Sequence, residues 1–204
     1  MGKAAEISGF VASKIYLIQS RMDSPWSKSM LAKLRRGVGK NPAEAPEIWE
    51  ITLNGLPEEL LYKGQPEKGS ATEAEWAIHT ALTLYALHQQ GNSYGVSAGR
   101  SDGGLSFGSA MRRLILPDRT NEESIKRRFN AIITSNDLSE LSNHGRGAIQ
   151  LMKSSPKPIK LDYPLFAGDL YGYQLKKNSV RLRWGRDFYS MDKGEKEEQK
   201  ESGE

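Results

Sequence analysis

The chain of 204 residues contains no cysteine. This absence excludes a disulfide framework, thiolate zinc sites, iron–sulfur clusters and a cysteine nucleophile. Long hydrophobic runs are also missing. No stretch approaches the ~20 apolar residues that span a bilayer, and no N-terminal stretch has the apolar core of a signal peptide. We therefore expect a cytoplasmic protein with no membrane association.

Groups that perform catalysis are scarce. There are three histidines, and His79 and His88 face opposite sides of one predicted helix at ~100° per residue. No HExxH motif or carboxylate cluster with metal-ligand spacing occurs, and the Gly/Ser-rich loop 91–104 lacks the ending of a P-loop. We predict no enzymatic activity, no cofactor and no metal, with His79, His88 and His144 as packing or surface residues.

Apolar residues recur with helical rather than strand spacing along nearly the whole chain. The strongest helix, 72–90, begins with a Thr72/Glu75 capping box and is apolar nearly all round, which is typical of a buried central helix. Ser24-Pro25 marks another helix start. We predict an all-α fold of about nine helices. The ten candidate segments are 7–21, 25–36, 46–51, 57–61, 72–90, 107–114, 121–135, 137–153, 163–177 and 180–189.

Pro117 and the C-terminal composition indicate the domain organisation. We predict two small packed helical bundles, 1–116 and 117–190, followed by a disordered acidic tail, 191–204. From residue 192 onward six acidic residues and three lysines give −3, so the total of +4 leaves +7 on the preceding residues. A body with this charge tends to attract polyanions such as nucleic acid, although a soluble surface without such a partner is the simpler alternative.

Basic side chains lie on the expected outer sides of several predicted helices. The planar fork of arginine fits two phosphate oxygens, so these residues are candidate backbone contacts. The alternatives are helix-dipole stabilisation and surface pairs such as Arg183 with Asp187. The four tryptophans fall on apolar stripes and are expected in the core. The candidate nucleic-acid-binding residues are Lys33, Arg35, Arg36, Lys40, Arg112, Arg113, Lys126, Arg127, Arg128, Arg146, Lys153, Arg183 and Arg186.

Four segments, in order along the chain, resemble one known family. They are Leu34-Arg35-Arg36-Gly37, the stretch Gly104-Leu105-Ser106-Phe107-Gly108-Ser109-Ala110, the group Arg127-Arg128-Phe129 with His144-Gly145-Arg146, and the final Val180–Tyr189 segment. Together they resemble the CasB family, the small subunit of the type I-E CRISPR Cascade complex, over about residues 10 to 190. Ser109 departs from the pattern, because relatives often carry a basic residue there.

The resemblance implies a two-bundle, non-catalytic subunit in antiviral defence. It implies that two copies stack head to tail beside the large and backbone subunits. Their basic surface would support the crRNA and target strand, and hold the displaced DNA strand of the R-loop. The match ranks Arg35, Arg36, Arg127, Arg128 and Arg146 first as contacts, ahead of those on the predicted helices 107–114 and 180–189.

Two other functions stay open at this point. A helix-turn-helix-type regulator would bind one duplex sequence, but no segment pairs a short glycine turn with an exposed helix rich in base-reading side chains. An assembly scaffold whose basic faces meet acidic protein would bind no nucleic acid at any salt concentration.

Overall fold

The structure is a computed structural model that describes residues 2–61 and 71–190. Within this part of the chain the fold is all-α, as predicted. No described helix is both long enough and apolar enough to cross a membrane. The predicted acidic tail lies outside the described residues. The α-helices are α1 (Lys3–Gln19), α2 (Pro25–Arg36), α3 (Trp49–Thr52), α4 (Glu73–Gln89), α5 (Phe107–Arg112), α6 (Glu122–Thr134), α7 (Leu138–Ser154), α8 (Tyr163–Leu175) and α9 (Lys177–Tyr189).

Local sequence signals set the helix starts. The Ser24 side chain accepts a hydrogen bond from the Ser27 amide, and Pro25 occupies the first turn of α2. Thr72 and Glu75 form the predicted capping box of α4. The predicted helix after Pro57 is wrong, because residues 58–60 form only a turn. One turn fixes several dihedral angles for one or two hydrogen bonds, so a segment this short does not form a helix without further packing.

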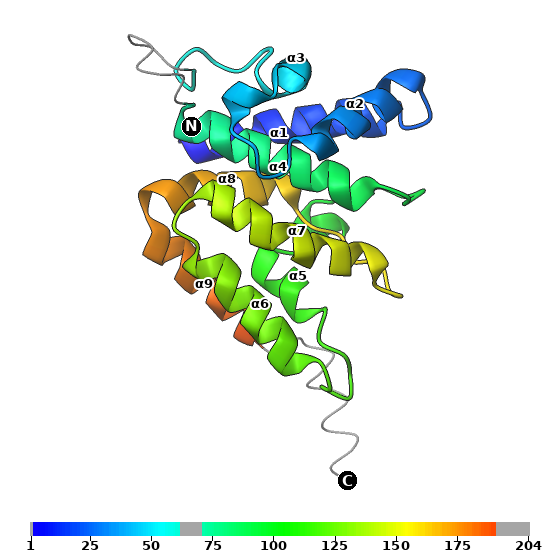
Figure 1. Ribbon diagram of the computed structural model, residues 1–204, viewed down its shortest axis with the longest axis vertical. Coiled ribbons are helices and arrows are strands. Elements are labelled where there is room, and N and C mark those ends of the chain that lie inside the picture. The colour runs from blue at the N-terminus through cyan, green and yellow to red at the C-terminus, as the bar shows by residue number, and fades with distance from the viewer. Residues whose placement is uncertain (1, 62–70, 191–204) are drawn as a thin grey trace.

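Helix α4 is the centre of the fold. It packs against α1 and α2 on one side and against α7 and α8 on the other, as Figure 1 shows. Every residue from Ala77 to Gln89 is buried. This enclosure explains why the helix shows no polar face in the sequence.

A second group of helices, α5, α6 and α9, lies in the lower part of Figure 1. Helix α5 packs closely on α9, and a Cβ on Gly108 would lie 2.2 Å from the Trp184 carbonyl oxygen. Ser106 caps α5 and donates a hydrogen bond to Asp187 of α9 at 2.6 Å. The Gly-Leu-Ser-Phe-Gly segment therefore has a packing role in this fold.

The two groups share helices α7 and α8. Helix α8 packs on α1 and α4 as well as on α9, while α7 packs on α4 and α6. Isolated bridges from Ser97 and Leu105 to Leu161 also connect the segment between α4 and α5 to the segment before α8. Packing thus crosses residue 117 extensively, and the division of the chain into two domains at that residue stays a prediction.

Candidate nucleic-acid interface

The loop that follows α2 is fixed on α7. The Gly39 amide donates to Ser142 Oγ at 3.1 Å, and Ser139 Oγ donates to the Gly39 carbonyl at 3.1 Å. Arg146 Nη2 donates to the Val38 carbonyl at 3.1 Å. These bonds join residues that are about a hundred positions apart in the chain. They bring the basic end of α2 beside Arg146 of α7.

Glycine geometry and a buried histidine shape the same turn. Gly39 has φ of +81°, a conformation that favours glycine. Gly37 is buried, and its carbonyl oxygen lies 2.9 Å from His79 Nε2. Burial lowers the pKa of His79, more than the hydrogen bond to Gly37 raises it. His79 is therefore neutral near pH 7 and holds the end of α2 against α4.

Helix α6 contributes further cations near Arg146, in addition to those at the end of α2. Arg128 Nη1 lies 3.3 Å from the position that a Cβ on Gly147 would occupy. Arg128 and Arg146 therefore flank the same turn of α7. We call Arg35, Arg36, Lys40, Arg128 and Arg146 the basic strip, and we include Arg127 because it is exposed and adjacent to Arg128 in the sequence.

The charges of the basic strip are not neutralised within the described part of the chain. None of its six side chains forms an ion pair with a described carboxylate. Partial burial, and then the neighbouring Arg36 charge, lower the pKa of Arg35. Clustered cations without carboxylate partners are what a phosphate backbone would complement.

Two other candidates, on α7 and α2, form no ion pair with a described carboxylate. Lys153 of α7 donates to Gln90 Oε1 at 3.2 Å, a neutral partner. It lies seven residues beyond Arg146, so the two share nearly the same side of α7 at a separation of about 10 Å along the axis. Lys33 is half-buried on the last turns of α2.

Two candidates have carboxylate partners instead. Lys126 Nζ lies 3.1 Å from Glu122 and 3.4 Å from Glu123, and the bond to Glu122 raises the pKa of Lys126. Arg183 pairs with Asp169 of α8 rather than with Asp187. These pairs reduce the charge that either cation offers to a phosphate. Sequence spacing within one helix did not indicate the Arg183 partner, which comes from another helix.

The remaining candidates lie on α5 and α9. Arg112 Nη1 donates to the Phe188 carbonyl at 3.4 Å, which attaches α5 to the end of α9. Arg113 and Arg186 are exposed on these helices. Within the described residues, no hydrogen bond or ion pair joins Arg186 to the basic strip.

Asp169 is a buried carboxylate that the sequence analysis did not single out. It is 4% exposed and accepts a hydrogen bond from Trp184 Nε1 at 2.6 Å in addition to the Arg183 pair. Burial raises the pKa of Asp169, against the lowering effect of Trp184 and Arg183. A charged residue in the middle of the apolar stripe of α8 is the sequence signal that could have indicated a buried carboxylate. The contacts give it a structural role.

The expected placement of the aromatic and histidine residues is correct except at one position. Trp184 is fully buried, and Trp26 and Trp76 are half-buried against the core. Trp49, which was also expected in the core, is 41% exposed because α3 is only one turn long at the edge of the fold. His79 and His88 are buried, and His144 lies on the surface beside Glu140.

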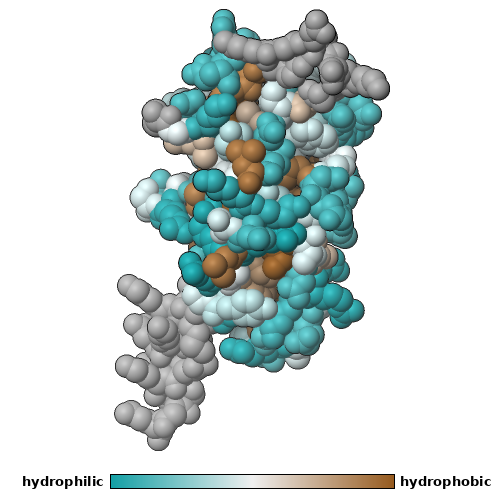
Figure 2. Space-filling view, turned by 90° about the vertical axis from the view of Figure 1, so that its left-hand side faces the viewer, coloured by the Kyte–Doolittle hydropathy of each residue, from teal (hydrophilic) through white to brown (hydrophobic). Residues whose placement is uncertain are grey.

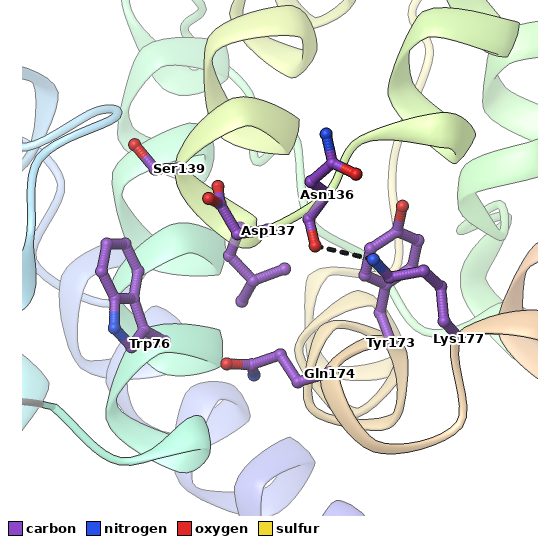
Figure 3. Close-up of a pocket in the computed structure, with 8 residues that line it drawn as sticks. Trp76, Asn136, Asp137, Ser139, Tyr173, Gln174 and Lys177 are labelled. Carbon is purple, nitrogen blue, oxygen red and sulfur yellow. Dashed lines mark hydrogen bonds between the residues drawn. The ribbon is translucent and has the colours of Figure 1, made fainter.

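A pocket of about 290 Å³ lies between the starts of α4 and α7 and the α8–α9 junction (Figure 3). One of its lining residues, Ser139, also bonds to Gly39 beside Lys40 of the basic strip. Lys177 Nζ donates to the Asn136 carbonyl, and Gln174 donates to the Glu73 carbonyl. Asp137 accepts the Glu140 amide as the cap of α7. These polar groups already serve the backbone, and the pocket lining offers no nucleophile with an adjacent base. No described group of three or more His, Asp or Glu side chains could hold a metal ion.

Comparison with known proteins decides the family. The sequence profile of CRISPR-associated protein Cse2 matches residues 30–189. The chain belongs to the Cse2 family. Cse2 proteins of this type, also called CasB, are small subunits of type I-E CRISPR systems, so the resemblance expected from the sequence is confirmed. No curated protein sequence matches the chain.

Two solved Cse2-family structures share the fold. CasB from Thermobifida fusca is 30% identical with a TM-score of 0.71, and the alignment covers 91% of this chain and 98% of that protein. A Cse2-family CRISPR-associated protein from Thermus thermophilus is 18% identical with a TM-score of 0.62, covering 93% and 99%. The first supports the family and the second the fold. The chain is thus a Cascade small subunit.

Proposed function

We propose that this Cse2-family subunit is non-catalytic and holds nucleic-acid backbones along the basic strip. In the assembled complex the strip would support the crRNA and target strand, and bind the displaced DNA strand of the R-loop. This role serves antiviral defence as part of a ribonucleoprotein complex with the large subunit, the backbone subunits and a second copy of the chain.

The observation that carries the proposal is the convergence of cations from three helices. Arg146 is bonded to the loop that follows Arg36, and Arg128 approaches the next residue of α7, Gly147. Each phosphate that a cation neutralises releases condensed counterions, which drives binding without sequence preference. Exchanging the DNA duplex for a heteroduplex with the guide RNA changes the free energy little. A few protein contacts to the backbone can therefore shift the equilibrium toward the open R-loop.

The two alternative functions, regulator and scaffold, predict different binding surfaces. A helix-turn-helix regulator would concentrate its contacts on one exposed helix placed in a major groove. The basic strip instead takes its arginines from three helices: two from the end of α2, two from α6 and one from α7. A scaffold would use the strip to bind acidic protein and would show no affinity for nucleic acid.

The test compares charge reversals on and off the basic strip. Arg35→Glu with Arg36→Glu and Arg127→Glu with Arg128→Glu are the strip variants. Arg21→Glu with Lys28→Glu is the control, because both residues are exposed at the opposite end of α2 or before it and the net charge changes equally. Fluorescence anisotropy with labelled single-stranded DNA, over a salt series, measures the affinity.

We expect weak, sequence-independent binding by the wild type that falls steeply with salt. Losing two phosphate contacts should reduce the slope of log K against log salt by about 1.4 for a single strand. The same strip variants should shorten R-loop lifetime in the reconstituted complex while circular dichroism stays native. Salt-insensitive, sequence-specific binding would favour the regulator. Absence of binding, or equal losses in the control, would contradict the proposal.

A further inference from the structure

One pair of exposed residues has a chemical reactivity of its own. Asn54-Gly55 is the only place in the sequence where glycine follows one of the eight asparagines. The pair lies in the turn after α3, and α3 is at the top of Figure 1. Elsewhere, the face shown in Figure 2 has small hydrophobic patches between hydrophilic areas. An asparagine side chain can react with the next backbone nitrogen, and glycine hinders that approach least because it has no side chain.

The reacting groups of this pair are exposed and free. Asn54 and Gly55 are both exposed, and a Cβ on Gly55 would have nothing within 4 Å. Gly55 has φ of +79°, so the turn itself favours glycine at this position. The amides of Asn54 and Leu56 donate to the carbonyls of Trp49 and Leu53. Within the described residues, no hydrogen bond engages the Gly55 amide between them or the Asn54 side chain.

Lys14 of α1 contacts the same peptide bond. Its Nζ donates a hydrogen bond to the Asn54 carbonyl oxygen at 2.6 Å. This oxygen and the Gly55 nitrogen belong to one peptide unit, whose atoms share charge by resonance. When the Gly55 amide loses its proton, negative charge therefore collects on the oxygen that the Lys14 ammonium contacts. A charged donor at that position stabilises the deprotonated amide, as donors in an oxyanion hole stabilise a developing negative charge.

The fold holds the Lys14 ammonium at this position. Lys14 is half-buried, and its Nζ lies 4.8 Å from the centroid of the Phe10 ring. Burial lowers the pKa of Lys14, more than the nearby Glu50 charge raises it. A half-buried ammonium interacts more strongly with a developing negative charge than a fully solvated one does, because less water screens it.

We propose that Asn54 is a self-modification site, which deamidates through a succinimide with Lys14 as the activating residue. The Gly55 nitrogen gives its proton to a solvent base and attacks Asn54 Cγ. The bond from Cγ to the side-chain nitrogen breaks, and that nitrogen leaves as ammonia with a proton from water. Water then opens the ring at either carbonyl carbon, which gives aspartate or isoaspartate at position 54. The net change is the gain of water and the loss of ammonia.

The position of Lys14 also favours one of the two products. Isoaspartate forms when water attacks the carbon of the former Asn54 backbone carbonyl, whose oxygen Lys14 contacts. A hydrogen bond from a cation polarises that carbonyl, and the free carboxylate that results lies beside the same ammonium. We therefore expect isoaspartate to exceed aspartate.

The modification changes both the charge and the backbone of this end of the molecule. Residues 41–61 contain five glutamates and no lysine or arginine, so a new carboxylate changes their net charge from −5 to −6. Isoaspartate also adds one atom to the backbone of the turn that leads to buried Leu56. This inference goes beyond the proposed function and does not depend on nucleic-acid binding.

Incubation of the full chain in mildly alkaline buffer, followed by peptide mass spectrometry, tests the site. An isoaspartyl methyltransferase with labelled S-adenosylmethionine measures the isoaspartate. Asn178 is the internal control, because it is exposed but the following amide, of Ser179, donates to the Lys176 carbonyl at 3.0 Å. We expect Asn54 to convert roughly tenfold faster than Asn178, where a hydrogen bond must first break. Asn54→Gln should remove the rapid conversion.

Variants of Lys14 separate activation from packing. Lys14→Met keeps an apolar stem on Phe10 without the charge, Lys14→Arg keeps a cation, and Lys3→Met removes a charge from the exposed start of the same helix. We expect Lys14→Met to slow the conversion of Asn54 roughly tenfold and to lower the isoaspartate fraction, because a charged donor to the peptide oxygen is lost. Lys14→Arg should keep most of the rate, and Lys3→Met should keep all of it.

Two results would overturn the proposal. Conversion of Asn54 no faster than that of Asn178 would remove the site. An unchanged or faster rate in Lys14→Met would show that the lysine only holds the turn, and would remove its activating role. Because neither measurement uses nucleic acid, failure of this inference and failure of the basic strip are distinguishable.

Discussion

Acidification should destabilise the protein through His88 of the central helix. The imidazole is fully buried, and its Nδ1 lies 3.2 Å from the Tyr163 hydroxyl. Burial, and then the charge of Lys153, lower the pKa of His88 to about 4. The unfolded chain has a histidine pKa near 6.5. Between these values the unfolded state binds more protons than the native state, so the free energy of unfolding falls as the pH falls.

The size of this effect follows from the shift. A lowering of about 2.5 pKa units corresponds to roughly 3 kcal/mol, lost progressively from about pH 6.5 to pH 4 with a slope of at most ~1.4 kcal/mol per pH unit. This is a large fraction of the ~5–15 kcal/mol that stabilises a typical domain. The pKa of His79 is also lowered, and it contributes in the same direction.

Urea unfolding followed by circular dichroism, at pH values across this window, measures the effect. His88→Gln should show a shallower decline in unfolding free energy than the wild type, because every other titrating group is shared by the two proteins. His144→Gln, which removes an exposed imidazole, is the matched control. If His88→Gln kept the full pH dependence of the wild type, the reasoning from burial would be refuted.

Four further substitutions test packing by the same unfolding assay. Asp169→Ala should cost about 1–3 kcal/mol, because it leaves the buried Trp184 Nε1 without its acceptor. Gly108→Ala should cost about 1–3 kcal/mol or more, since the new Cβ meets the α9 backbone, while Gly185→Ala meets nothing and should gain up to about 1 kcal/mol. Thr72→Ala should cost about 1 kcal/mol by removing the α4 cap. Reversed ranking of the two glycine variants would contradict the packing described for α5 and α9.

Features encoded within a few residues were predicted well. The Thr72/Glu75 capping box and the Ser24-Pro25 start depend on neighbours three residues apart, and both are present. The burial of α4 followed from its composition alone. Most helix ends were predicted within one or two residues, and the all-α class was predicted without tertiary information. The starts of α1 and α9 were not, because α1 begins four residues earlier than predicted and α9 three residues earlier.

Features that depend on distant residues were not predictable in the same way. The bond between Arg146 and the Val38 carbonyl joins α7 to the end of α2, and helical periodicity carries no information about that pairing. Periodicity also showed that Arg183 points outward but gave no sign that Asp169 would meet it. Trp49 was expected in the core because its neighbours are apolar, whereas the shortness of α3 leaves its ring at the surface.

The enclosure of α4 by four other helices has a kinetic consequence. Its amides are hydrogen-bonded inside the helix and shielded on every side, so hydrogen exchange there requires opening of the whole fold. The exchange rate of α4 amides therefore reports global stability, whereas amides of α9, where Leu182 and Tyr189 are exposed, exchange through smaller local openings. Any ligand that binds only the folded state slows exchange in α4, wherever on the surface it attaches.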